Sequence, residues 1–288
     1  MKLEKAFDNI LVVGLGLVGG SILKSLKYYS FGGDVYGLDS DHKIITEAHK
    51  LGLIKNQDTK ITHELKKTLV IFSIPTLSID KAIKELKKYS NLIDPLFTDT
   101  CSVKSSVLES LKKENPELIS NFVLSHPIAG SEKNGLSSSL PNLFEKKLTI
   151  ICPHEDNRDS DLKKVECFWN ELKSLTKRLP PDYHDDIFAK TSHLPHVISF
   201  TLMDALFKNL GLKTFLYSGG SLEDYTRIAS SDPLMWKDIM MANEKHIIES
   251  IEMFKDSLER LLFLIKDKDD KELLSFFSSV KKSRDSLL

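Results

Sequence analysis

The chain has 288 residues, 41% hydrophobic and 28% charged, which is typical of a folded globular protein and long enough for two domains. Its 40 Lys and Arg residues nearly balance 41 Asp and Glu residues, and the net charge of −1 argues against a nucleic-acid partner. The N-terminus lacks the apolar core of a signal peptide, no apolar run is long enough to span a bilayer, and the three cysteines are widely spaced, so we expect a cytoplasmic protein with no membrane partner.

The first predicted strand, residues 9–13, leads into a glycine-rich turn and then into a helix over residues 22–27. This order of strand, G-x-G-x-x-G and helix is the dinucleotide-binding fingerprint. The first glycine would permit a tight turn, the second would let the backbone approach a pyrophosphate, and the third would let the helix pack close to the strand. N–H groups at the helix start favour phosphate oxygens. We therefore expect the whole turn to bind the cofactor, namely Gly14, Leu15, Gly16, Leu17, Val18 and Gly19.

A second strand, residues 34–38, ends at Asp39, about 20 residues beyond the last glycine, where a ribose-binding carboxylate is expected. Asp39 would accept hydrogen bonds from the ribose and repel a 2′-phosphate, so NAD is predicted over NADP. Lys43 keeps NADP open as an alternative. Asp39 is also in position to cap the helix predicted over residues 41–51.

Strands over residues 68–75 and 96–99 alternate with helices over residues 77–89 and from about residue 103. This alternation predicts an α/β fold with a Rossmann-like, doubly wound, mostly parallel sheet. The carboxyl ends of parallel strands border the ligand crevice, so we expect cofactor contacts at the carboxyl ends of two of these strands. These are Ser73, Ile74 and Pro75 in one segment and Asp99 in the other, with Ser102 further along as a candidate helix cap.

The next strand, over residues 122–126, stops abruptly at Ser125-His126-Pro127, on the same edge of the predicted sheet. A strand that ends in a histidine at the mouth of a sheet suits a general base. A turn histidine that only makes hydrogen bonds is the alternative.

Strands over residues 147–153 and 176–179 flank a helix over residues 161–175, and only helices are predicted after Pro180-Pro181. We therefore assign residues 1–181 to a dinucleotide-binding domain and residues 182–288 to an all-helical domain. Pro195 predicts a kink or a new helix start within residues 184–210. Between residues 244 and 265, apolar residues recur with a period near 3.6, which indicates a core face or a subunit interface.

Five motifs, in this order, resemble the prephenate dehydrogenase family, and they extend along nearly the whole chain. The resemblance implies an NAD-dependent oxidative decarboxylation in tyrosine biosynthesis, in which prephenate yields 4-hydroxyphenylpyruvate, carbon dioxide and NADH. It also implies a homodimer that forms through the helical domain. The motifs are residues 14–19, Thr98-Asp99-Thr100-Cys101-Ser102-Val103-Lys104, residues 125–132, Ser192-His193-Leu194-Pro195-His196 and residues 226–236.

The resemblance also implies roles for single residues. His126 matches the family's catalytic histidine, which accepts the proton of the ring hydroxyl, and Ser102 matches a serine that binds the same hydroxyl and orients the imidazole. Arg227 matches an arginine that holds a substrate carboxylate. Five further positions match the substrate site or its entrance: His193, His196, Glu132, Trp236 and His184. We predict no metal site, because neither an HExxH pattern nor a carboxylate cluster accompanies His193 and His196.

The chain departs from the family pattern at two positions. Cys101 stands where the family usually has glycine, and Glu223 stands where it often has a basic residue. The loss of a positive charge leaves arogenate, which carries an ammonium group, as the alternative substrate. A dehydrogenase for 3-hydroxy acids would need a helix-borne lysine base, and no such motif stands out. A dinucleotide-sensing module without turnover is the alternative from a different functional class.

Overall fold

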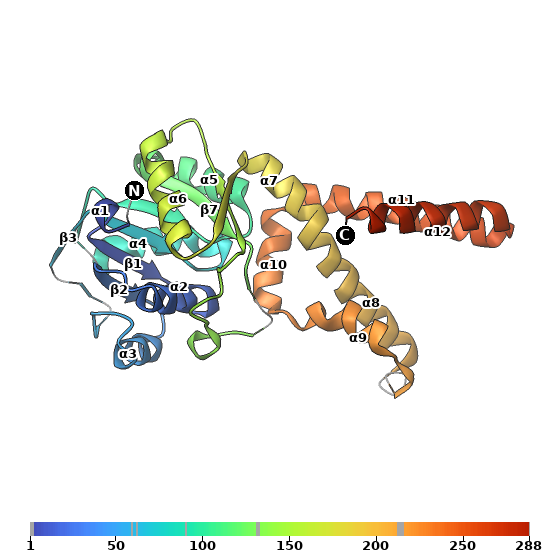
Figure 1. Cartoon of the computed structure of the whole chain (residues 1–288), viewed down its shortest axis with the longest axis horizontal. Coiled ribbons are helices and arrows are strands. Elements are labelled where there is room, and N and C mark those ends of the chain that lie inside the picture. Colours follow the sequence, from blue (N-terminus) through green and yellow to red (C-terminus); the bar gives the residue numbers. More distant parts are fainter. Residues whose placement is uncertain are drawn as a thin grey trace.

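The computed structural model describes residues 3–58, 60–61, 63–89, 91–130, 133–211 and 216–287, which form a sheet-containing part and a helical part (Figure 1). A seven-stranded sheet has the order β2-β1-β4-β6-β7-β8-β9, and its neighbours are parallel except β7 and β8. Two further parallel strands, β3 (Glu64–Lys66) and β5 (Asn91–Ile93), form a second sheet. The strands of the large sheet are β1 (Asn9–Val13), β2 (Asp34–Leu38), β4 (Thr68–Phe72), β6 (Leu96–Asp99), β7 (Phe122–Pro127), β8 (Leu148–Cys152) and β9 (Leu175–Arg178).

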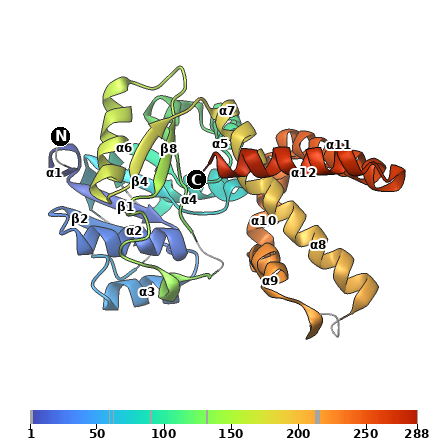
Figure 2. The same ribbon diagram turned by 45° about the vertical axis from the view of Figure 1, so that its right-hand side comes forward.

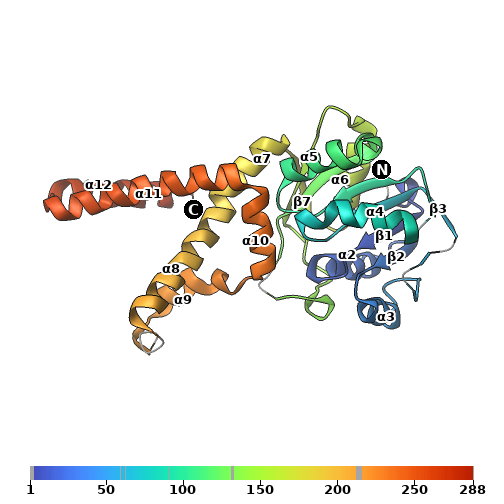
Figure 3. The ribbon, with the colours of Figure 1, turned by 180° about the vertical axis from the view of Figure 1, so that it is seen from behind.

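The central strands are mostly apolar because successive side chains point into two different cores. In β1, Ile10 and Val12 belong to one core and Leu11 to the other. The first core also contains side chains of α1 (Leu3–Ala6), α2 (Leu17–Tyr28), α3 (His42–Lys50) and α6 (Asp159–Glu171). The second contains side chains of α4 (Ile79–Tyr89) and α5 (Lys104–Glu114), which lie in front of the sheet in Figure 3. The predicted Rossmann-like α/β arrangement is confirmed.

The parallel order brings the carboxyl ends of β1, β4, β6 and β7 to one edge of the sheet. At this edge β1 passes into the glycine turn, β4 is followed by the 3₁₀ turn η1 (Thr76–Ser78), and β7 ends with His126 and Pro127. Two other 3₁₀ turns, η2 (Pro116–Asn121) and η3 (Leu136–Ser138), lie in the connections on either side of β7. The glycine turn and His126 therefore lie at the same edge of the sheet.

A continuous helical stretch begins at Pro181 and joins the sheet-containing part to the helical part. It consists of α7 (Pro181–Phe188), the π-helical turn η4 (Ala189–His193) and α8 (Leu194–Leu210), which ends before Gly211 with its positive φ of 65°. Pro195 has no N–H to donate, and its ring would crowd the carbonyl four residues earlier in a regular α-helix. The wider π turn provides room there, and the next α-helix begins at Leu194, as one of our two expectations had it, while the helical stretch itself is unbroken.

The remaining helices are α9 (Gly220–Thr226), the 3₁₀ turn η6 (Arg227–Ser230), α10 (Pro233–Ala242), α11 (Glu244–Asp267) and α12 (Asp270–Asp285). Helices α11 and α12 form a hairpin that extends away from the sheet, and α8 and α9 extend in another direction (Figure 2). No described helix is long and apolar enough to cross a membrane. Exposed large apolar side chains are frequent on the α11–α12 hairpin: Ile248, Met253, Leu258, Leu262, Phe263, Ile265, Leu274, Phe277 and Val280.

Candidate functional site

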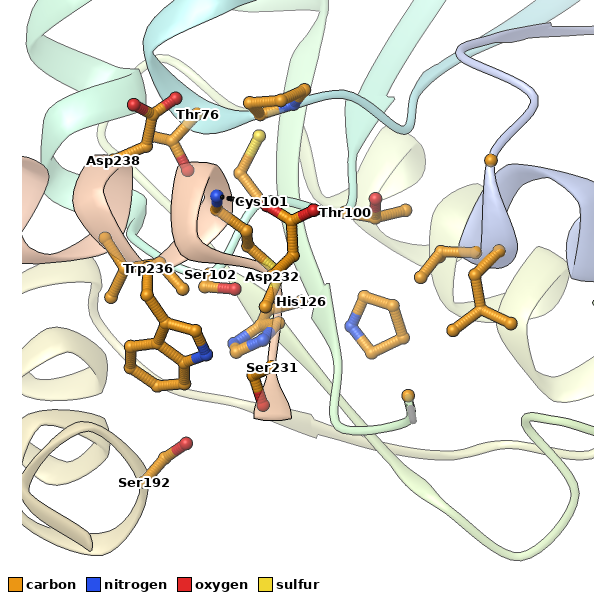
Figure 4. A pocket seen from close by; sticks show the side chains of 18 of the residues that line it. Thr76, Thr100, Cys101, Ser102, His126, Ser192, Ser231, Asp232, Trp236 and Asp238 are labelled. Atoms are coloured by element: carbon orange, nitrogen blue, oxygen red, sulfur yellow. Dashed lines mark hydrogen bonds between the residues drawn. The ribbon is translucent and has the colours of Figure 1, made fainter. Parts of the chain in front are cut away.

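A pocket of about 660 Å³ lies between the carboxyl edge of the sheet and the helical part (Figure 4). Its walls come from segments that are far apart in the sequence and that only the folded chain brings together. It contains most of the site residues predicted from the sequence: Gly16, Leu17, Val18, Ser73, Ile74, Pro75, Ser102, His126, His193, His196, Arg227 and Trp236. Glu132 lies outside the described residues.

The glycine turn at the start of α2 fits a dinucleotide. Gly14 has a positive φ of 90°, and a Cβ there would lie 2.3 Å from the carbonyl oxygen of Ser73. A Cβ at Gly19 would lie 1.9 Å from the carbonyl oxygen of Gly14, whereas a Cβ at Gly16 would meet nothing within 4 Å. Helix α2 has Gly16 as its N-cap and no side-chain cap. Two glycines thus allow the close packing, and the third leaves open space beside N–H groups that favour phosphate.

Asp39 lies at the end of β2 and is tied to the glycine turn. Its carboxylate accepts hydrogen bonds from the N–H groups of Leu15 at 2.8 Å and Asp41 at 2.9 Å. The alternative role of Asp39 as a helix cap is wrong, because Asp41 caps α3 by accepting from the Lys43 N–H at 2.9 Å. Asp39 does not line the pocket, but each carboxylate oxygen has a lone pair to spare for a ribose hydroxyl.

The structure corrects the expectation that Asp99 borders the crevice. Asp99 is completely buried, forms an ion pair with Lys104, and accepts the N–H groups of Cys101 at 3.0 Å and Ser125 at 3.1 Å. Lys104 is also completely buried and donates to the Ser125 carbonyl at 2.8 Å. A buried charge needs a partner of opposite sign, so the carboxylate turns toward Lys104 and away from the pocket.

Ser102 is not a helix cap, in contrast to the expectation from its position. Helix α5 begins at Lys104, and its N-cap residue Val103 makes no side-chain hydrogen bond. Instead Asp185, from α7, accepts the N–H of Lys104 at 2.8 Å and the N–H of Ser105 at 2.7 Å. A carboxylate from a distant segment therefore caps α5. The Ser102 side chain lies in the pocket close to His126, as Figure 4 shows.

His126, which is half-buried, begins a chain that continues through the buried side chains of His184 and Asp185. Its Nδ1 lies 2.9 Å from Nε2 of His184, and Nδ1 of His184 lies 2.8 Å from Oδ1 of Asp185. The ring of Phe188 packs against both imidazoles, with centroid distances of 5.1 Å to His126 and 4.5 Å to His184. We predicted His184 as a substrate contact, but the structure places it behind His126, where it does not line the pocket.

The surroundings keep both imidazoles of this chain neutral. Burial, followed by the nearby His184, Lys104 and His193, holds the pKa of His126 well below its usual value. Burial also lowers the pKa of His184, although Asp185 opposes the effect. Burial disfavours the charged form of Asp185, but hydrogen bonds from His184 and from two backbone N–H groups outweigh it, so the pKa of Asp185 lies below its usual value.

Two other predicted histidines also line the pocket. His193 receives a hydrogen bond from the Asn243 amide at Nδ1, at 3.2 Å, and burial lowers the pKa of His193 to about 4. The neutral ring of His193 therefore carries its proton on Nε2 and can donate it. His196 stacks on Trp236 with a centroid distance of 3.9 Å. The Nε1 of Trp236 is buried without a hydrogen-bond partner among the described residues.

Several pocket residues were not predicted from the sequence. Asp232 caps α10 through the Met235 N–H at 2.9 Å and accepts a bond from Asn134 at 3.1 Å, while Asp238 pairs with Lys237 at 2.9 Å. Cys101 is buried with its thiol 3.5 Å from the Ile74 carbonyl, so the backbone tolerates a side chain here. Burial raises the pKa of the Cys101 thiol, which stays protonated. Asp185, which lies behind the pocket, was also missed. The sequence signal that could have indicated it is its position next to His184.

Two family models match consecutive parts of the chain. Residues 22–177 match the model of the prephenate dehydrogenase nucleotide-binding domain, and residues 180–279 match that of the prephenate dehydrogenase dimerization domain. The cyclohexadienyl dehydrogenase of Zymomonas mobilis is 30% identical over 286 residues, which cover 96% of this chain and 95% of that protein. The prephenate dehydrogenase of Bacillus subtilis is also 30% identical, over 97% of this chain and 76% of its own length.

Solved structures give the same result. The prephenate dehydrogenase of Aquifex aeolicus in complex with hydroxyphenyl propionate and NAD+ superposes with a TM-score of 0.87 and 34% identity, covering 98% of this chain and 99% of that one. The Synechocystis arogenate dehydrogenase shares the fold, with a TM-score of 0.78 and 23% identity over 97% of this chain and all of that one.

Proposed function

Because this chain belongs to the prephenate dehydrogenase family, we propose that it converts prephenate to 4-hydroxyphenylpyruvate by NAD-dependent oxidative decarboxylation, a step of tyrosine biosynthesis. One observation carries the proposal. A neutral imidazole, that of His126, lines a single pocket that begins at the glycine turn and ends at His193 and Arg227. A base thus lies between a place for a dinucleotide and groups that bind carboxylates.

NAD, when bound, accepts a hydride from the ring carbon that bears the hydroxyl group. The protein's own residues fit it: residues 14–19 would hold the pyrophosphate, Asp39 would bind the ribose hydroxyls, and residues 73–75 would border the cofactor. Asp99 acts only indirectly, through the buried ion pair described above. This use of Asp39 favours NAD over NADP because its charge repels a 2′-phosphate.

His126 accepts the hydroxyl proton at the ring nitrogen that His184 leaves vacant, Nε2, as the alcohol becomes a carbonyl. Ser102 hydrogen-bonds the same hydroxyl and holds it against the imidazole. Loss of carbon dioxide then restores the aromatic ring, and this provides the driving force.

Prephenate carries two carboxylates, and the far wall of the pocket offers donors for them. Arg227 presents a planar guanidinium, which suits bidentate binding of a carboxylate. The Nε2–H of His193 is a further donor, and so is the Nε1–H of Trp236, which has no hydrogen-bond partner within the described part of the chain; His196 supports Trp236 by stacking on it. Glu132 lies outside the described residues, so its role at the pocket entrance stays a prediction from the sequence.

Arogenate is the second candidate substrate, and Asp232 and Asp238 favour it. Both carboxylates line the pocket and can compensate the ammonium group that distinguishes arogenate from prephenate. Glu223, which raised the same alternative from the sequence, is exposed on α9 and does not line the pocket. The case for arogenate over prephenate therefore rests on Asp232 and Asp238.

The test is the production of NADH by the purified protein with prephenate or arogenate and with NAD or NADP. We expect the highest kcat/KM for prephenate with NAD. No NADH from either substrate at any pH between about 6 and 9 would overturn the proposed activity. A higher kcat/KM for arogenate would reassign the substrate and keep the enzyme class.

We also propose that the protein is a cytoplasmic homodimer that associates through the helical domain, with the domain division after Pro181. Support comes from the exposed apolar side chains of the α11–α12 hairpin and from the match of residues 180–279 to a dimerization domain. Light scattering should give twice the mass of one chain. Replacement of the exposed Leu258 and Leu262 by lysine should shift the mass to that of a monomer, whereas an unshifted mass would refute this interface.

A further inference from the structure

The contacts of Asp185 determine its protonation state. Two N–H groups at the start of α5, those of Lys104 and Ser105, donate to its two carboxylate oxygens at 2.8 and 2.7 Å. The positive end of the helix dipole adds to this stabilisation of the anion. An ionised carboxylate has no proton to give, so the contact of Asp185 with His184 has one possible direction: Nδ1–H of His184 donates to Oδ1 of Asp185 at 2.8 Å.

The direction of the next contact follows from the first. A neutral imidazole has one N–H, and His184 uses it toward Asp185, so Nε2 of His184 is an acceptor. The Nδ1 of His126, 2.9 Å away, must then be the donor. His126 is left with its proton on Nδ1 and a lone pair on Nε2, the nitrogen that remains for a ligand of the pocket that His126 lines.

We propose that His184 and Asp185 are positioning residues that fix the Nδ1–H tautomer of His126, so that its Nε2 is ready to accept the substrate proton. The inference rests on the proposed function for its catalytic consequence, but the tautomer itself can be observed without substrate. Neither positioning residue touches the pocket, and both are fully buried. Their effect on the reaction passes through His126.

The proton balance of the step is simple. The hydroxyl oxygen loses its proton to Nε2 of His126, whose Nδ1–H bond to His184 stays in place, and the resulting imidazolium faces the negative charge of Asp185 through His184. No second proton moves along the chain, and the proton on Nε2 leaves through the pocket after turnover. The other charged or titratable groups around His126 are His193 in η4 and Lys104 in α5, the latter paired with Asp99 of β6.

This chain of contacts also crosses the junction between the two parts of the protein. His184 and Asp185 lie on α7, whereas His126 lies on β7 and the capped helix is α5. The same carboxylate therefore docks the helical part on the sheet-containing part and orients the base. His126 therefore has the Nδ1–H tautomer only when α7 packs against α5.

The tautomer of His126 can be measured in the full-length protein without substrate, by long-range ¹H–¹⁵N correlation spectra with ¹⁵N-labelled histidine. His126→Asn identifies the signals of His126. We expect a protonated Nδ1 and an unprotonated Nε2 in His126 at neutral pH. A protonated Nε2 would overturn the proposal whether or not the protein turns over prephenate, so its failure is distinguishable from failure of the proposed function.

The kinetic test replaces His184 by phenylalanine, which fills the space but accepts no hydrogen bond. We expect kcat to fall about 10²-fold with KM and NAD affinity nearly unchanged, because His184 lies outside the pocket. His184→Gln, whose amide oxygen can accept from Nδ1 of His126, should recover much of the loss. His246→Phe is the matched control: His246 is also buried and bonds Asp182 of α7 at 3.1 Å, but it is no part of this chain.

Thermal melting shows whether each variant is folded. If His184→Phe does not fold, the ¹H–¹⁵N spectra of the wild-type protein still test the tautomer of His126. Wild-type kcat in a folded His184→Phe variant, or equal losses in His184→Phe and His184→Gln, would overturn the positioning role. A loss in His246→Phe as large as that in His184→Phe would show that the effect is general to buried histidines of this region.

Discussion

Replacement of Lys104 by methionine should lower the free energy of unfolding by about 3–5 kcal/mol, the usual cost of removing one partner of a buried ion pair. Lys104 and Asp99 are each 0% exposed, so solvent cannot compensate the charge left behind. Asp99 would keep the N–H groups of Cys101 and Ser125 as donors, whereas the Ser125 carbonyl would lose the bond from Lys104. Methionine nearly preserves the volume of lysine, so the loss would be mainly electrostatic.

Urea unfolding followed by tryptophan fluorescence measures this change. Trp169 is a suitable probe because its indole N–H donates to Ser125 at 3.1 Å, next to the ion pair, while Trp236 reports on the helical part. The double variant Asp99→Asn/Lys104→Met removes both charges and should recover much of the stability. A Lys104→Met variant within 1 kcal/mol of the wild type, or a double variant less stable than Lys104→Met alone, would refute the reasoning.

The same substitution should change the pH dependence of catalysis. The positive charge of Lys104 is one of the causes that lower the pKa of His126, so its removal should raise that pKa. The acid limb of kcat/KM, where His126 becomes protonated, should therefore move to higher pH in Lys104→Met. A limb that stays in place would show that burial and the neighbouring histidines alone determine the pKa of His126.

Three further predictions follow from the site. His126→Asn should lower kcat about 10²–10⁴-fold and leave NAD binding intact in a fluorescence titration; an unchanged kcat would remove His126 from its role. Gly19→Ala should abolish NAD binding because the new Cβ would lie 1.9 Å from the Gly14 carbonyl oxygen, whereas Gly220→Ala, with open space around it, should not alter binding. Burial lowers the pKa of His126 and His184, so the unfolded chain binds protons below pH about 6.5 that the native protein does not. Stability measured in urea should then fall as the pH drops below about 6.5, by up to about 1.4 kcal/mol per pH unit for each histidine, and a flat profile would contradict these directions.

Much of the sheet could be predicted from local patterns. The ranges of β1, β2 and β6 match the predicted ranges residue for residue, because a strand that is largely buried carries a run rich in apolar residues and is bounded by turn residues. The antiparallel direction of β8 could not be predicted, since such a run is apolar in either direction. The range of helix α12 was not predicted, although only helices were expected after Pro181, because none of its described side chains is buried and no core-facing stripe marks it.

The parts of the site that belong to a local motif could be predicted from the sequence. The parts in which tertiary packing sets the direction of a side chain or its partner could not. The glycine turn and His126 follow directly from a strand and its end, and both line the pocket. Position at a strand end does not reveal side-chain direction, which is why Asp99 was placed in the crevice and lies against Lys104 instead. Asp185 is 81 residues from the helix start that it caps, and no sequence pattern joins the two.

His184 and His193 lie on the same helical stretch, from Pro181 to Leu210. The number of residues between them therefore matters for the site as much as the identity of the two histidines. Both belong to one continuous helical stretch, so the angle between them is determined by the number of residues that separate them and by the π turn. An insertion or deletion of one residue between them would rotate His193 and His196 by about 100° relative to His184 and Asp185. Related chains should therefore tolerate substitutions in this segment far better than changes of its length.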